Sequence, residues 1–594
     1  METIIRNKKE HYEVLYQEKS KQYNRLANFR LLVLLLGLFT TYQWIQNGRI
    51  GLWAGLSSIA YVGFFILIKQ HQKVKEEVER FEALIKVNEK YLARLTQDWQ
   101  NFKEDGAEFL EQDHPYSFDL DIVGPRSLYQ KINTTHTWYG KHKLAESLLR
   151  PSFSETELLQ RQKAVSELMH NLDFCQHLES TKQKKMASNP EKMIAYATRK
   201  ETFFTKPWMK PYTQGMTIVT LGILGLSIGL SADVLGVLAT LLLGGNLIVQ
   251  YAFIGRITEA KGLLSTLVYD LQAYTRLLEQ IEAQTFYSEH LVALKSKLFN
   301  KQHTATEAIK QLERLSNRAN ISYQPIAAIV LNATVLWDLQ TMIALESWKR
   351  TYGTQMQMYL ETMGEIESLV SFAVLGHIEA QTCFPLIESE GKTIEGTQLG
   401  HPLIAPKGRV TNDVTMKEAI FIITGSNMSG KTTFLRTIGM QLVLAYAGAP
   451  VVAKDFKCSR MGLYTSMRIR DDLSEGVSTF YAELTRIKQI VEASRSEKIC
   501  FLIDEIFRGT NSVDRIIGAK SVLKGLQHEG AIGGMTTHDL EICQLAEPNR
   551  ILNYHFTESY EADHIQFDYK LKDGASTTTN AKYLMRRVGI EVID

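Results

Sequence analysis

Long apolar runs are the most conspicuous feature of the hydrophobic pattern, and the first two lie close to the start of the chain. Residues 31–45 and 50–68 are almost wholly apolar, and a turn of a few polar residues separates them. A helix needs about 20 apolar residues to cross the hydrocarbon core of a bilayer. The pattern therefore predicts a transmembrane hairpin over 30–70. A signal peptide is the alternative, but a second apolar run follows at once and no A-x-A-like cleavage site is found.

A second pair of apolar runs, 216–232 and 233–255, is rich in glycine and contains one conspicuous polar residue, Asn246. The alternative is a buried hairpin in a soluble domain, but two adjacent runs of this length without charge favour a second membrane hairpin. Lys and Arg flank both hairpins, whereas the turns within them hold only Arg49 and Asp233. By the positive-inside rule this predicts a multi-pass cell-membrane protein with its N-terminus, helical arms and C-terminal region in the cytoplasm.

Between and after the hairpins, apolar residues recur every three to four positions within charged segments. This spacing after each hairpin predicts amphipathic helices, and residues 300–375 continue with almost no Gly or Pro. The formal net charge is only +2, so no overall basic field attracts nucleic acid, and DNA contacts would need local patches. The five cysteines are scattered without a C-x-x-C pair, which predicts reduced thiols in a cytosolic protein.

The segment EAIFIITGSNMSGKTTFLRTIG has the pattern of strand, loop and helix, and residues 425–432 match G-x-x-x-x-G-K-[ST]. Backbone N–H groups of such a loop wrap the phosphates of a nucleotide, and the dipole of the following helix favours the bound anion. Lys431 is predicted to reach the β- and γ-phosphates. Thr432 is predicted to ligate Mg²⁺ through its hydroxyl. The pattern therefore predicts an ATP site.

A second part of this site is predicted at the end of the apolar strand 499–503, where Asp504 and Glu505 follow. Open α/β sheets bind ligands at the carboxyl ends of their strands. Asp504 would hold Mg²⁺ through water, and Glu505 would orient or deprotonate the attacking water. His538 follows another small apolar strand and could sense the γ-phosphate, although a lone histidine is more often structural. Ser478 opens a helix and by itself is typical of a helix cap.

In this order, GSNMSGKTT, STFYAEL, DEIFRGTN and TTHD resemble the MutS family of mismatch-repair ATPases. The resemblance covers 119–170 and 375–592, and it extends over 256–375 only as a helical pattern. It implies an ATPase that uses ATP and Mg²⁺ and forms a homodimer through its ATPase domains. It further implies that Ser478 reaches the nucleotide of the partner subunit, as in ABC-type ATPases, and it favours His538 as the γ-phosphate sensor.

The resemblance also places Asn427 in the nucleotide loop, which completes the predicted site. The predicted catalytic residues are Glu505, His538 and Lys431, and the predicted Mg²⁺ ligands are Thr432 and Asp504. The predicted ATP-binding residues are Gly425, Ser426, Asn427, Met428, Ser429, Gly430, Lys431, Thr432 and Thr433, with Ser478 acting in trans.

The predicted fold is an α/β P-loop ATPase domain of the ABC type at the C-terminus, preceded by an all-α core and lever region that two transmembrane hairpins interrupt. The predicted boundaries are a cytosolic N-terminal segment at 1–29, hairpin 1 at 30–70, an amphipathic helix at 71–113, a MutS-like α-helical core at 114–205, hairpin 2 at 206–256, a helical lever and core at 257–375, and the MutS-like ATPase domain at 376–594.

The chain departs from the family where DNA is read. The core begins near 119, which leaves no room for the mismatch-reading and connector domains, and no clamp, dimerisation tail or nuclease domain is recognised. We therefore expect a membrane-anchored MutS-like ATPase whose family implies DNA mismatch repair but whose own DNA binding is weakly supported. One alternative is an ATP-driven conformational switch that acts on a membrane or an unknown protein partner without DNA. A transporter-like ATPase is the other, although the spans hold almost no ionisable residues.

Overall fold

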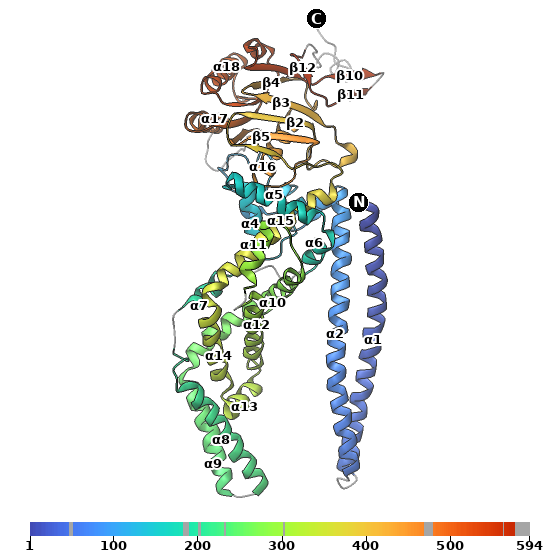
Figure 1. The fold of residues 1–594 in the computed structure, drawn as a ribbon, viewed down its shortest axis with the longest axis vertical. Coiled ribbons are helices and arrows are strands. Elements are labelled where there is room, and N and C mark those ends of the chain that lie inside the picture. The colour runs from blue at the N-terminus through green and yellow to red at the C-terminus, as the bar shows by residue number, and fades with distance from the viewer. Residues whose placement is uncertain are drawn as a thin grey trace.

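The structure is a computed structural model of the chain, and it describes residues 1–46, 51–181, 189–199, 203–230, 233–300, 303–468, 479–561 and 564–576. The molecule is elongated. A domain with two β-sheets forms one end, a helical core lies beneath it, and two helical arms extend from the core (Figure 1). The tips of both arms lie at the end of the molecule that is farthest from the sheets.

The first arm consists of two antiparallel helices, α1 (Glu2–Gln46) and α2 (Gly51–Leu95), of 45 residues each. At 1.5 Å per residue each helix is about 67 Å long. The segment 1–29 is therefore not a separate element: it is the first part of α1 and pairs with the last part of α2. Ion pairs and aromatic stacking hold these charged halves together: Lys9–Glu89 at 3.1 Å, Lys19–Glu77 at 2.6 Å, and Tyr12 stacked on Phe81.

The helix predicted over 71–113 ends earlier, at Leu95. Side chains beyond this point compete for the backbone, because the Thr96 hydroxyl donates to the Asp98 carboxylate at 2.8 Å and accepts the Asp98 N–H. The buried Arg94 side chain also ties the end of α2 to the core. It donates to the carbonyl oxygens of Lys131 and Asn133. Two short 3₁₀ helices, η1 (Asp98–Asn101) and η2 (Ala107–Phe109), follow.

The second arm contains α8 (Met209–Leu230) and α9 (Asp233–Ala252), which pack against each other. A break at Phe253 separates α9 from α10 (Ile254–Ala283), which returns towards the core. The lever continues through α12 (Ala305–Ile321), α13 (Pro325–Val335) and α14 (Trp337–Tyr352). Within the described residues, four helices are long and apolar enough to cross a membrane, and they are α1, α2, α8 and α9.

The helical core surrounds α15 (Met356–Ile378), which is buried along nearly its whole length. It packs against α4 (Trp138–Leu149), α5 (Glu155–Met169) and α11 (Glu289–Leu298). The other core helices are α3 (Leu128–Ile132), α6 (Leu172–Glu179) and α7 (Glu191–Thr198). Because α15 ends at Ile378 and the first strand begins at Leu386, α15 joins the helical region to the sheet domain.

The C-terminal domain is built on a six-stranded sheet of order β12-β9-β4-β8-β7-β6, parallel except for β12. Its strands are β4 (Ile420–Thr424), β6 (Gly462–Ser466), β7 (Ile499–Asp504), β8 (Ile532–Thr536), β9 (Ile551–His555) and β12 (Lys572–Asp573). All residues of β4, β7 and β8 are buried, which explains their continuous apolar sequences. The helices α16 (Lys431–Tyr446), α17 (Thr479–Ser496) and α18 (Ser512–His528) accompany this sheet.

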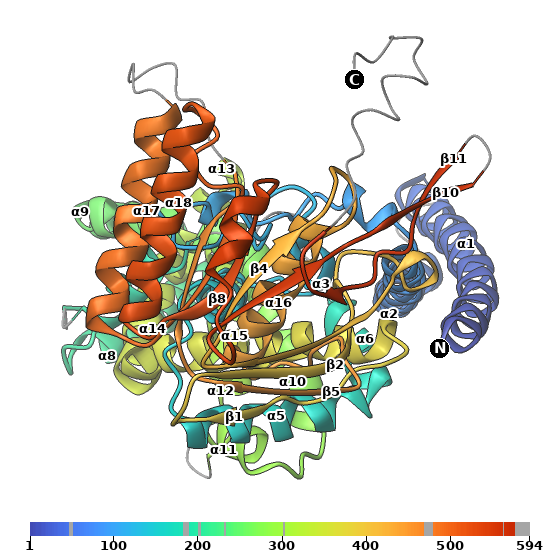
Figure 2. The same ribbon diagram turned by 90° about the horizontal axis from the view of Figure 1, so that it is seen from above.

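A second, mixed sheet has the order β1-β5-β2-β3. Its strands are β1 (Leu386–Glu388), β2 (Thr393–Leu399), β3 (Asn412–Lys417) and β5 (Asp455–Ser459), and a separate hairpin is formed by β10 (Glu558–Glu561) and β11 (His564–Phe567). Seen from above, α17 and α18 lie side by side, on the opposite side of the domain from α1 and α2 (Figure 2). A C-terminal α/β domain preceded by a helical region is thus confirmed.

Candidate nucleotide site

The predicted phosphate loop connects β4 to α16, and its two glycines adopt backbone conformations that other residues rarely reach. Gly425 has φ +143° and Gly430 has φ +109°. A Cβ atom on Gly425 would lie 2.9 Å from both the Phe556 carbonyl oxygen and the Ser429 hydroxyl. Glycine is therefore required for the chain to turn at the end of β4 and to start α16 with free N–H groups.

The side chain of Lys431 folds back over this loop. Its Nζ donates to the carbonyl oxygens of Gly425 at 2.9 Å and Ser426 at 2.8 Å. Burial lowers the pKa of the Lys431 ammonium, and the nearby carboxylates of Glu505 and Asp504 oppose this shift. The Ser429 hydroxyl is buried and has no partner among the described residues. This cradle of cationic and neutral donors fits a bound polyphosphate.

The side chains predicted to hold Mg²⁺ meet where the first turn of α16 lies beside the carboxyl end of β7. The Thr432 hydroxyl donates to Asp504 Oδ1 at 2.9 Å. The Thr536 hydroxyl donates to the same oxygen at 2.5 Å, because β7 and β8 are paired with Asp504 opposite Thr536. Carboxylate and hydroxyl oxygens are the hard ligands that Mg²⁺ prefers, and protein sites usually share the ion with substrate phosphates. The oxygen donors present fit Mg²⁺, and Asp504 and Thr432 are the candidate ligands.

Glu505 and His538 form a contact pair beside the loop. His538 Nε2 lies 2.9 Å from Glu505 Oε1 and 2.9 Å from Asn427 Oδ1. The hydrogen bond from His538 holds the pKa of the Glu505 carboxyl below its ordinary value, against the opposing effect of burial. Glu505 also has a positive φ of +52°, and its N–H donates to the Thr536 carbonyl at 3.2 Å. The carboxylate is thus kept ionised, as a base requires.

Three further residues belong to this site although their roles were not predicted. Arg508 pairs with Asp504 Oδ2 at 2.9 Å and with Glu505 Oε2 at 3.2 Å. Glu483 on α17 accepts the backbone N–H of Phe507 and so joins α17 to the loop after β7. The third residue, Thr536, donates its hydroxyl to Asp504. Arg508 and Glu483 lie inside the quoted motifs, but sequence spacing gives no sign of which neighbours they contact.

The other predicted residues are placed as follows. The Ser426 hydroxyl donates to Glu558 at 2.6 Å, whereas Met428 and Thr433 are exposed at the surface of the loop and of α16. Ser478 lies outside the described residues, and α17 is described from Thr479 onwards. The structure thus brings Asn427, Lys431, Thr432, Asp504, Glu505 and His538 together around one loop.

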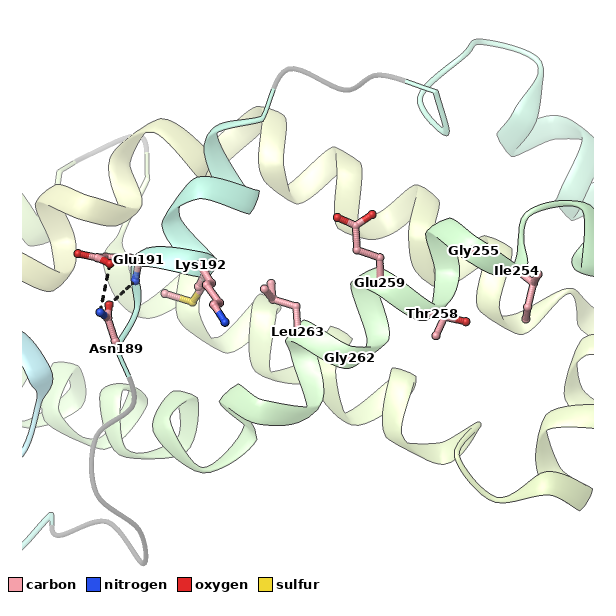
Figure 3. A pocket seen from close by; sticks show the side chains of 10 residues that line it. Asn189, Glu191, Lys192, Ile254, Gly255, Thr258, Glu259, Gly262 and Leu263 are labelled. Carbon is pink, nitrogen blue, oxygen red and sulfur yellow. Dashed lines mark hydrogen bonds between the residues drawn. The ribbon is translucent and has the colours of Figure 1, made fainter.

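A separate cavity of about 890 Å³ lies between α7 and the first turns of α10 (Figure 3). Lys192 and Met193 line it from α7, and Gly255, Gly262 and Leu263 line it from α10. The described lining residues supply neither a phosphate loop nor a paired base and nucleophile. The loop at Gly425 is therefore the candidate site that the residues and their contacts favour.

Comparison with known proteins identifies the domain that carries this loop. The MutS domain V family matches residues 421–589, which include β4 from its second residue, the phosphate loop, Asp504, Glu505 and His538. This C-terminal region is therefore similar to MutS domain V.

Similar MutS proteins occur in archaea and bacteria. The DNA mismatch repair protein MutS 2 of Halobacterium salinarum is 31% identical over 248 residues, which is 40% of this chain and 28% of that protein. MutS of Natronomonas pharaonis is 30% identical over 239 residues, 39% of this chain and 28% of its own length. MutS of Chlorobium chlorochromatii is 28% identical over 309 residues, 50% of this chain and 33% of its own length. The match therefore spans about three-tenths of these relatives.

Proposed function

We propose that this MutS-family chain is a Mg²⁺-dependent ATPase anchored in a membrane. The observation that carries the ATPase proposal is the convergence of two pairs, Thr432–Asp504 and Glu505–His538, on one phosphate loop. Lys431 would bind the phosphates, and the ionised Glu505 would accept a proton from the attacking water. Bound Mg²⁺ would neutralise charge on the β- and γ-phosphates.

The second part of the proposal is that two copies share the ATP site through their ATPase domains. Exposed apolar side chains on α17 and α18 support it: Tyr481 and Leu484 on the first helix, Val513 and Ile517 on the second. These two helices contact each other, so the side chains belong to one region of the surface. Apolar regions of this kind are typical of protein interfaces.

The membrane anchor is supported by the surfaces of both arms. Large apolar side chains are exposed along the lower parts of α1 and α2 and along α8 and α9, among them Leu35, Phe39, Ile59, Phe65, Ile218, Ile228, Leu241 and Ile248. Removing one such side chain from water contributes about 1.5–3 kcal/mol, so lipid is the natural environment for them. Because the tips of both arms lie at the same end of the molecule, one bilayer could receive both (Figure 1).

The first arm also packs against α15, the helix that leads into the ATPase domain. A buried apolar cluster contains Ile5 of α1, Val87 and Tyr91 of α2, and Val374 and Ile378 of α15. The first arm is therefore packed against the end of the helix that leads into the first strand. We propose that ATP binding closes the dimer, that hydrolysis releases it, and that α15 transmits this change to the arms.

At the start of the ATPase domain, Glu379 follows α15 directly and forms a buried ionic cluster. Its carboxylate accepts from Lys131 at 3.1 Å and from Arg409 at 2.7 Å. This cluster ties the helical core to the entry of the sheet domain, which supports movement of the two as a unit.

DNA handling is the second candidate function, because the matched relatives are named DNA mismatch repair proteins. The two functions are separated by the ATPase rate of the full-length protein in lipid nanodiscs, titrated with homoduplex, mismatched and branched DNA at two salt concentrations. Steady turnover that no DNA changes supports a switch acting on a membrane or protein partner. Stimulation that fades with salt supports DNA handling. The absence of Mg²⁺-dependent turnover in every condition would refute the ATPase proposal.

A further inference from the structure

The helix α13 presents an apolar stripe that no part of the described chain covers. Ile326 is 80% exposed, Ile329 is 60% exposed and Val330 is 54% exposed. Residues spaced by three and four lie on one face of a helix, so the three side chains form a continuous surface. The sequence PIAAIVL at the start of α13 contains no polar side chain. An apolar face of this kind requires an apolar partner.

The position of α13 places this stripe beside the second arm. The helix packs against both α8 and α9 (Figure 1). Its axis makes an angle of 79° with the helix that follows, and Leu336, with φ +50°, lies at the bend. The chain thus leaves the lever at Ile321, crosses beside the arm as α13, and re-enters the lever as α14. At 11 residues α13 is about 16 Å long, too short to cross a bilayer core of about 30 Å.

The C-terminal end of α13 is capped by side chains of the second arm and of α14. Asn246 Nδ2 donates to the Ala333 carbonyl oxygen at 2.7 Å. The Val335 carbonyl oxygen accepts from Thr217 at 3.2 Å and from Gln340 at 2.9 Å. Helix ends leave carbonyl groups unpaired, and within lipid such groups must be satisfied by the protein itself. This arrangement gives Asn246, the conspicuous polar residue of the second hairpin, a role at membrane depth.

Next to α13, a group of polar side chains surrounds Asp338, and we call this group the polar boundary. The buried carboxylate of Asp338 accepts from Gln250 at 2.7 Å, Lys261 at 2.6 Å, Asn332 at 3.0 Å and Ser322 at 2.7 Å, and so joins α9, α10 and both ends of α13. Exposed aromatic side chains occur at the same ends of these helices: Trp208 before α8, Tyr251 in the last turn of α9 and Tyr323 before α13. Trp and Tyr gather where a membrane meets water.

We propose that α13 is a membrane-inserted half-helix whose Ile326–Ile329–Val330 stripe contacts the acyl chains of the leaflet nearest the ATPase domain. The proposal rests on the membrane anchoring proposed above. The stripe, the capped C-terminal carbonyls and the polar boundary are three independent observations that agree with it. The lever is then attached to the bilayer by α13 as well as by the two helices of the arm.

The test uses single-cysteine variants of the full-length protein, labelled with an environment-sensitive fluorophore in nanodiscs. Four of the native cysteines are buried and Cys383 is half-buried, so a Cys383→Ser background limits labelling to the introduced position. Ile326→Cys reports on α13. Ile248→Cys, at a 73% exposed position of α9, tests whether the second arm lies in lipid. Leu159→Cys, at a 52% exposed position of α5, is the reference for a label in water. Each sample is quenched with brominated lipids and, separately, with aqueous iodide.

We expect blue-shifted emission from the labels at 326 and 248, loss of their intensity in brominated lipid, and no effect of iodide on either. The label at 159 should respond only to iodide. Lipid quenching at 248 with iodide quenching at 326 would overturn the α13 proposal and leave the anchor standing. Emission at 326 that neither quencher affects would show that protein, such as a second copy, covers the stripe, which also overturns the proposal. Iodide quenching at both positions would refute the anchor itself.

Discussion

Replacing Glu505 by glutamine separates ATP binding from ATP hydrolysis. The substitution removes the negative charge and keeps the size of the side chain and an oxygen near His538 Nε2, which lies 2.9 Å from the native carboxylate. It leaves Lys431 and the Thr432–Asp504 pair unchanged. We therefore expect Glu505→Gln to bind ATP and Mg²⁺ like the native protein and to lose turnover.

The size of the loss follows from the role that the geometry assigns to Glu505. A positioned general base typically contributes about 10²- to 10⁴-fold to a rate, which corresponds to about 2.7–5.5 kcal/mol of activation free energy. The hydrogen bond from His538 keeps the pKa of the native carboxyl low, so at neutral pH the native protein has the base ready and the glutamine variant has none. The rate should therefore fall by at least the lower of these factors.

The assay is single-turnover hydrolysis in nanodiscs, combined with equilibrium binding of a fluorescent ATP analogue and light scattering for the dimer. The variant should hold ATP and accumulate as the closed dimer. Glu390→Gln, at an exposed position between β1 and β2, is the matched control and should hydrolyse ATP at the native rate. Native turnover by Glu505→Gln would refute the assignment of the base. Loss of ATP binding would instead show that Glu505 holds the loop together.

Three further predictions concern the site and its attachment. Lys431→Ala should abolish measurable binding of the ATP analogue, whereas Lys417→Ala, at an exposed position of β3, should not change it. His538→Ala should move the acidic limb of the kcat/KM profile to higher pH, because the hydrogen bond that lowers the pKa of Glu505 is lost; an unmoved limb would contradict this. Glu379→Gln leaves Lys131 and Arg409 buried without their anion, at a cost of about 3–5 kcal/mol. Its thermal unfolding midpoint should fall, and that of the exposed Glu390→Gln should not.

Several properties of this protein could be predicted from the sequence because they depend on neighbouring residues. The phosphate loop is one, since its glycines, Lys431 and Thr432 must stand at fixed spacing between a strand and a helix. Asp504 and Glu505 are another, since an apolar strand of the required length ends at them. The apolar arms are a third, because the length and composition of a run determine whether it suits a membrane.

Other properties were decided only by the tertiary structure. The pairing of residues 1–29 with the end of α2 is invisible in the sequence, because a charged helix does not reveal which surface it contacts. The same applies to Thr536, which reaches Asp504 only through the pairing of β8 with β7, and to Arg508 and Glu483, which connect elements across the site.

The second arm shows most clearly which properties the sequence determines and which depend on the tertiary structure. Asn246 is recognisable in the sequence as a polar residue in an apolar run, and PIAAIVL as a short apolar segment within the lever. Their relation is decided by folding, because a hydrogen bond between residues 87 positions apart depends on how α9 and α13 pack. Periodicity tells which face of a helix is apolar, whereas only packing determines what that face and its polar exceptions contact.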